Sequence, residues 1–172
     1  MKHGESFYDK TLFPTEKIKE TLIKILKIAG YTIKSEKIGF VTPDLYGVKG
    51  KHQIIISIKE KIEDALEGCR DLAAMKCFAG GKKDYVLAFP PISETDVLHF
   101  LFERTDWYFP MNEQTIMLWL VNPDRMESHP IMGYPYNEAL KNYLTNPEAV
   151  DLIVQLANKK MNEQLLEEED FS

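Results

Sequence analysis

The stretch Gln53-Ile-Ile-Ile-Ser-Ile-Lys59 decides the fold, because it is the strongest strand pattern in the chain. Four of its seven residues are isoleucines, and they fall on both faces of a strand, whose side chains point alternately to opposite sides. A strand that is apolar on both faces must be covered on both, which is typical of the interior of an α/β fold. Ser57 and Lys59 share one face of this strand, whereas Ile56 and Ile58 lie on the other.

Working outward, the sequence predicts strands and helices that alternate. Before the isoleucine strand, Gly47 and Gly50 indicate a hairpin. After it, an apolar repeat of helical period begins at Glu60 and ends at Gly80-Gly81. In all, we expect helices over 15–29, 60–79 and from Ser93, further strands over 31–37, 39–46, 84–89 and 115–121, a loop to about Tyr136, and helices over 137–144 and 147–157.

This order predicts an α/β fold, a three-layer sandwich with a mixed central β-sheet, followed by a helical C-terminal extension. The α/β core is expected over residues 1–122, and residues 123–172 are expected to form a loop and C-terminal helices that end in an acidic tail. Neither the G-x-G-x-x-G nor the G-x-x-x-x-G-K-[ST] phosphate-binding motif occurs in the chain. The pattern therefore argues against a doubly wound nucleotide-binding fold.

Composition limits the classes of protein that the chain can belong to. It has 172 residues, of which 44% are hydrophobic and 28% charged, with no apolar run that could span a bilayer and no secretory signal at its start. We therefore expect a cytoplasmic protein without membrane contact. The net charge is −6, but residues 1–83 carry 16 Lys and Arg against 11 Asp and Glu, whereas residues 84–172 carry 5 against 16. The overall acidity thus does not exclude a phosphate-binding surface on the first half.

One constellation suits phosphodiester chemistry. Pro43-Asp44 precedes the predicted hairpin, and Ser57-Ile58-Lys59 ends the isoleucine strand. If these two strands pair, Asp44 and Lys59 lie at the same end of the sheet, where an acid is the natural partner of a lysine among isoleucines. A carboxylate holds Mg²⁺ through oxygen, and a lysine beside it can orient or activate a water.

With these residues in place, the chain resembles the PD-(D/E)-x-K nuclease superfamily, which has the restriction-endonuclease-like fold. The resemblance covers about residues 15–121 and includes the helix start Ile62-Glu63-Asp64-Ala65-Leu66 and the strand 84–90 that ends in proline. It implies a Mg²⁺-dependent nuclease acting on nucleic acid, with Asp44 as the first metal ligand and Lys59 as the lysine that assists the attacking water.

The chain departs from the family pattern at the second acid. Ser57 occupies that position and is a candidate catalytic residue together with Asp44 and Lys59, but a neutral hydroxyl is a poor anchor for Mg²⁺. The resemblance implies that another acid replaces it, and the candidates are Glu67 and Asp71 on the next helix or Glu20 on the first.

Three functional interpretations follow. The first is a metal-dependent nuclease that uses Asp44, Lys59 and a relocated acid. The second is a catalytically degenerate member of the same fold that acts as a binding or scaffolding module. The third is an interaction protein that forms a homodimer through the aromatic loop Trp107–Asn112 and the final helix, without any nucleic-acid function.

Overall fold

The computed structural model describes residues 13–79, 83–91, 116–132 and 140. The predicted helix from Ser93 and the aromatic loop lie outside these residues, as does the predicted C-terminal extension apart from residues 123–132 and Leu140. Leu140 is helical and fully buried. No helix in the described part of the chain has both the length and the apolar character needed to cross a membrane.

The described residues form one six-stranded sheet in which the strands lie in the order of the sequence. Strands β3, β4 and β5 are parallel to one another, and the remaining neighbours are antiparallel. The sheet is therefore mixed, as predicted. Its strands are β1 (Thr32–Lys34), β2 (Leu45–Lys49), β3 (His52–Ile58), β4 (Lys83–Phe89), β5 (Ile116–Asn122) and β6 (Glu127–Met132).

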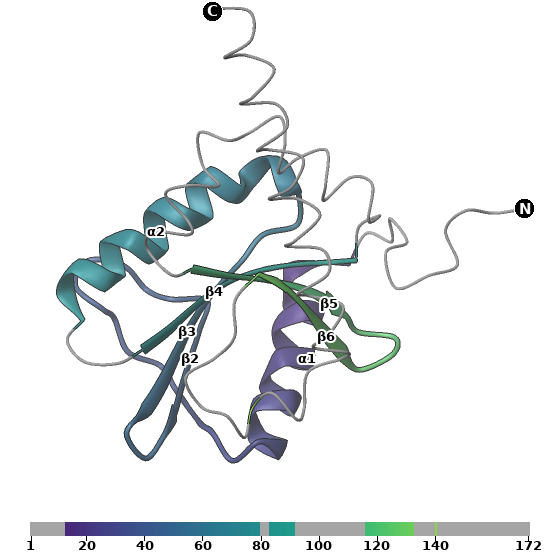
Figure 1. Ribbon diagram of the computed structural model, residues 1–172, viewed down its shortest axis with the longest axis horizontal. Helices are drawn as coiled ribbons and strands as arrows, with labels where there is room; N and C mark the ends of the chain where they lie inside the picture. The colour runs from purple at the N-terminus through teal and green to yellow at the C-terminus, as the bar shows by residue number, and fades with distance from the viewer. Residues whose placement is uncertain (1–12, 80–82, 92–115, 133–139, 141–172) are drawn as a thin grey trace, which may run out of the picture.

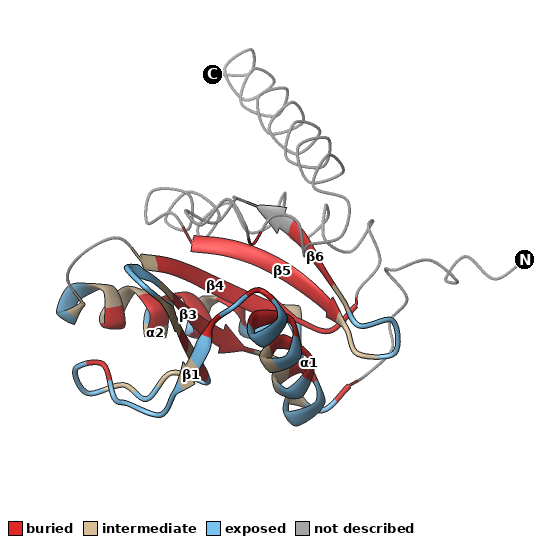
Figure 2. Cartoon of the chain, turned by 90° about the horizontal axis from the view of Figure 1, so that it is seen from below, coloured by how far each residue is buried: buried red, intermediate tan, exposed pale blue. Residues whose placement is uncertain are grey.

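Two helices of equal length cover opposite faces of the sheet and complete the predicted three-layer α/β sandwich (Figure 1). Helix α1 (Thr15–Ile28) precedes the sheet, and helix α2 (Ala65–Phe78) connects β3 to β4 after the short 3₁₀ turn η1 (Ile62–Asp64). Figure 2 shows the result along the sheet: the central strands are buried, and the outward sides of both helices are exposed.

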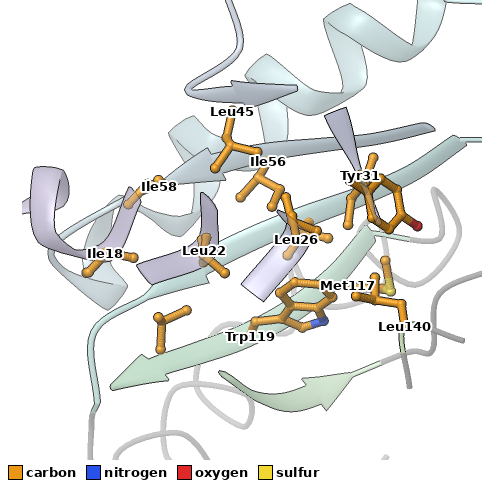
Figure 3. Packing of buried hydrophobic residues seen from close by; sticks show 14 of the residues in the cluster. Ile18, Leu22, Leu26, Tyr31, Leu45, Ile56, Ile58, Met117, Trp119 and Leu140 are labelled. Atoms are coloured by element: carbon orange, nitrogen blue, oxygen red, sulfur yellow. The ribbon is translucent and has the colours of Figure 1, made fainter. Parts of the chain in front are cut away.

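The isoleucines of β3 divide between the two resulting cores. Ile54, Ile56 and Ile58 pack beneath α1 together with the fully buried Trp119 (Figure 3). Ile55 points the other way and packs beneath α2. The prediction that this strand is buried on both faces is confirmed.

The hairpin between β2 and β3 differs from the prediction at Gly47. This residue lies within β2, and the turn is made by Gly50, whose φ is 59°. Gly47 is instead a packing position, because a Cβ there would lie 3.0 Å from Cγ2 of Ile54 and 3.3 Å from Cδ1 of Tyr31. Most of the predicted strand over 39–46 is likewise not a strand, since β2 begins only at Leu45.

Residues 127–132, which the sequence analysis places in a loop, form strand β6 antiparallel to β5. The loop interpretation is wrong for these residues, which include Pro130. Proline is tolerated in an edge strand, and β6 is the last strand of this sheet. The sheet thus continues beyond residue 122, and the division of the chain there stays a prediction.

Replacing Ile56 with alanine tests the two-sided burial of β3. Ile56 is fully buried, so Ile56→Ala is expected to lower the free energy of unfolding by about 2–5 kcal/mol. Ile28, which is 65% exposed at the end of α1, is the matched control, and Ile28→Ala should change stability by no more than about 0.5 kcal/mol. Urea unfolding followed by circular dichroism measures both, and equal effects would contradict the assignment of β3 as the central buried strand.

Candidate active site

The pairing of β2 with β3 brings the two halves of the predicted constellation to one end of the sheet. The two strands are antiparallel, and the first residue of β2, Leu45, lies opposite Ile56. One position beyond this pair stand Asp44 on one strand and Ser57 on the other. Leu45 and Ile56 both belong to the α1 side of the sheet, so the alternation of side chains assigns the next positions to the α2 side.

The carboxylate of Asp44 has a structural partner at this end. Its Oδ2 accepts a hydrogen bond of 2.7 Å from the backbone N–H of Ile58, fourteen residues further along the chain. Asp44 precedes the first residue of β2, so its side chain extends the β2–β3 contact past the last paired residues. Asp44 is exposed to solvent, and this bond accounts for one of its two oxygens.

Lys59 is held in place by its backbone and by its side chain. Its N–H donates to the carbonyl of Ala88 at 3.0 Å, which continues the contact of β3 with β4 beyond Ile58. Its side chain is only 18% exposed, and the ammonium nitrogen lies 3.3 Å from Oε1 of Glu67 and 4.0 Å from Oδ2 of Asp71. The expectation that Asp44 itself neutralises Lys59 is therefore wrong, because the two acids of α2 do so.

Helix α2 presents both acids to Lys59 because Glu67 and Asp71 are four residues apart and share one side of the helix. Gly68 lies beside them and lets the helix approach the sheet. A Cβ at residue 68 would overlap Cδ1 of Leu87 on β4 and would lie 3.5 Å from Cγ and Cε of Lys59. The lysine thus runs across the bare backbone of α2, with its ammonium group reaching the two carboxylates.

The remaining predicted residues occupy different environments. Ser57 is 3% exposed and is paired in register with Leu87, on the same side of β3 as Lys59. Its hydroxyl therefore lies beneath α2 rather than at the surface. Glu20 is exposed on α1, which covers the opposite face of the sheet, and the structure does not bring it to Lys59.

Two contributors to this site were not found from the sequence. Gly68 is an isolated glycine inside a helical pattern, and such a glycine often marks a close packing contact. The carbonyl of Ala88, which accepts the hydrogen bond from the N–H of Lys59, could not be predicted, because every residue has a backbone acceptor.

The carboxylate oxygens near Lys59 are of the type that Mg²⁺ prefers, although they do not form a complete set of protein ligands. No three Asp, Glu, His or Cys side chains among the residues described here lie close enough together to hold a metal ion. Mg²⁺ does not require such a cage, since it is usually bound by one or two carboxylates together with waters and substrate phosphates. Asp44, Glu67 and Asp71 supply carboxylate oxygens at one end of the sheet, which is the type of ligand that this ion prefers.

Cys69 and His129 do not offer a second chemistry. Burial raises the pKa of the Cys69 thiol to about 12, so this cysteine is protonated at neutral pH and is a weak nucleophile. Burial lowers the pKa of His129, which lies on β6 and away from Lys59 in the order of strands. Among the described residues, the candidate chemistry therefore rests on Lys59 and the carboxylates of Glu67 and Asp71 beside it.

Gly68→Ala tests the close approach of α2. Alanine favours a helix over glycine, yet the added methyl group overlaps Leu87, so the variant is expected to lose about 1–3 kcal/mol of stability. The double variant Gly68→Ala/Leu87→Ala removes the overlap and should show a coupling free energy in a double-mutant cycle. Additive effects of the two substitutions in urea unfolding would rule out this contact.

Asp44 can be tested by separating its hydrogen bond from its charge. Asp44→Asn keeps an oxygen that accepts from the N–H of Ile58, whereas Asp44→Ala leaves that donor without its partner. We expect the alanine variant to be less stable than the asparagine variant by about 1 kcal/mol. Thermal unfolding of the two variants measures this difference, and equal melting temperatures would contradict the bond.

Comparison with known proteins gives distant structural neighbours only. No protein-family model matches the chain, and no curated protein matches its sequence. Among solved structures, it is similar to a fdxN element excision controlling factor protein from Anabaena variabilis, with 12% identity, a TM-score of 0.46, and coverage of 64% of this chain and 94% of that one. It is similar to the same extent to an XisH family protein from Nostoc punctiforme, with 10% identity, a TM-score of 0.46 and the same coverage.

Proposed function

We propose that this protein is a Mg²⁺-dependent nuclease that hydrolyses phosphodiester bonds at the end of the sheet where Asp44 and Lys59 lie. The observation that carries the proposal is the position of Lys59 at the end of β3, where its mostly buried side chain brings the ammonium group to Glu67 and Asp71. A cation beside several carboxylates is the combination needed to bind a metal ion and a phosphate together.

Each residue has a role in this proposal. Asp44, through the oxygen that Ile58 does not use, and Asp71 or Glu67 would hold Mg²⁺. When bound, the ion polarises the phosphate and lowers the pKa of a water. Lys59 can exchange an exposed carboxylate partner for the phosphate or the attacking water, because Glu67 is 69% exposed and such ion pairs are weak. Ser57 is too buried to contact the substrate and supports the strand beneath α2.

A binding module without hydrolysis is the second candidate. The observation that favours it is that the acids of α2 already neutralise Lys59, and that one Asp44 oxygen is occupied by the backbone. Such a protein would retain nucleic acid in a salt-dependent manner but would not cleave it.

Lys59→Ala distinguishes the two candidates. If the protein is a nuclease, the variant should cleave single-stranded or plasmid DNA in Mg²⁺ or Mn²⁺ at least about 100-fold more slowly than the parent protein, because it has lost the group that assists the attacking water. Lys61→Ala, which removes an exposed lysine two residues further on, is the matched control and should cleave normally. Gel electrophoresis of the digested DNA measures the rates.

The alternative results are equally specific. Unchanged cleavage by Lys59→Ala would show that the activity belongs to a contaminant or that Lys59 has no catalytic role. Retention of DNA by the parent protein, with no cleavage in either metal ion, would favour the binding module.

A further inference from the structure

Two exposed phenylalanines form a pair beside the C-terminal end of α2. The side chain of Phe40 is 90% exposed and that of Phe78 is 56% exposed, although both are large and apolar. Their ring centroids are 5.6 Å apart and the ring planes meet at 89°, which is the favourable edge-to-face arrangement. We call these two residues the Phe40–Phe78 pair.

A tight turn fixes Phe40 in this exposed position. Ile38 and Val41 close the turn through two backbone hydrogen bonds, of 2.8 Å from the N–H of Ile38 and 3.2 Å from that of Val41. Gly39 and Phe40 form its tip. Ile38 is buried in the core beneath α2 and anchors the turn to the body of the protein.

Gly39 is the position at which the turn meets α2. Its φ of 64° suits glycine, and a Cβ at this residue would overlap the ring of Phe78. The turn backbone therefore lies directly on one ring and presents the other to solvent. An aromatic side chain held in this way loses little conformational entropy when a flat ligand stacks on it.

Two exposed lysines lie close to Phe40 in the sequence, Lys34 and Lys37. Lys37 is exposed and directly precedes Ile38, and Lys34 is exposed at the end of β1, opposite Tyr46 of β2. On α2, Lys76 lies 5.8 Å from the ring centre of Tyr85 and, two residues before Phe78 on a helix, faces a different side from that ring. Glu36 lies between these two lysines in the sequence, and its charge adds to the effect of burial that raises the pKa of Tyr46.

We propose that the Phe40–Phe78 pair, with Lys34 and Lys37, is a base-stacking surface for single-stranded nucleic acid. Exposed aromatic rings together with lysines bind single strands by stacking on the bases and attracting the phosphates. A duplex does not offer the same contact, because its bases are stacked on one another. Two rings are also much smaller than the roughly 1,600 Å² that a stable protein interface buries, which argues against a second copy of this chain as the ligand.

The surface and the candidate active site belong to one segment. Phe40 and Asp44 are both exposed and are four residues apart in the connection between β1 and β2, which lies below the left end of α2 in Figure 2. A single strand stacked on Phe40 would therefore be within reach of Asp44, since four residues span at most about 14 Å. The inference rests on the proposed function, because it specifies single-stranded nucleic acid as the substrate. Binding of that substrate can be measured without cleavage.

The experiment is fluorescence anisotropy of a labelled oligo(dT) with the full chain, in EDTA so that no cleavage occurs. Phe40→Ala is expected to weaken binding by about 5-fold or more, because one stacked base is worth about 1–3 kcal/mol. Phe40→Trp should restore binding, and Lys37→Ala should reduce the dependence of binding on salt. Ile28→Ala, which removes an exposed apolar side chain from α1 on the opposite side of the sheet, is the matched control and should bind normally.

The possible results separate this inference from the nuclease proposal. Binding that is unchanged by Phe40→Ala overturns the inference, as does equal affinity for a matched duplex. A concentration-dependent dimer that Phe40→Ala abolishes overturns it in favour of a second copy. If Phe40→Ala weakens binding but the parent protein never cleaves, the inference stands and the nuclease proposal fails; if the parent protein cleaves and Phe40→Ala binds normally, the reverse holds.

Discussion

Burial of strand β3 on both faces is the constraint on which the rest of this structure depends. Its isoleucines leave no polar side for water, so α1 must cover one face and α2 the other. The connection through α2 then makes β4 parallel to β3, and both strands end on the same side of the sheet. Because β2 is antiparallel, it begins where β3 ends, and this places Asp44 next to the last residues of β3.

The ion pairs of Lys59 contribute little to the stability of the fold. A fully buried lysine requires close partners, but this side chain keeps 18% of its surface in water and its partner Glu67 keeps 69%. An ion pair so well solvated is worth at most about 1 kcal/mol. It instead fixes the position of the ammonium group, which it holds at the end of β3 between two partly exposed carboxylates.

The sequence predicted those features that depend on periodicity or on the order of elements. The alternation of Ile56, Ser57, Ile58 and Lys59 was sufficient to assign each to a face, and the two helices and the mixed sheet followed from their apolar repeats. Contacts between segments far apart in the chain could not be predicted from the sequence. Glycine is needed at residue 68 because a side chain there would overlap Leu87, which lies on another strand. Lys59 pairs with acids of α2 because the packing of that helix brings them close, and no local sequence pattern encodes this packing.

The connection between β1 and β2 shows why the site and the proposed binding surface are physically linked. Ile38 anchors its first half in the core beneath α2, and the bond from Ile58 to Asp44 anchors its end to β3. Phe40 and Asp44 therefore project from a segment that is fastened at both ends, and Gly39 keeps it in contact with Phe78. Under the proposals made above, a ligand stacked on Phe40 would not need to order this segment first, so its binding energy would remain available to position a phosphate near Lys59.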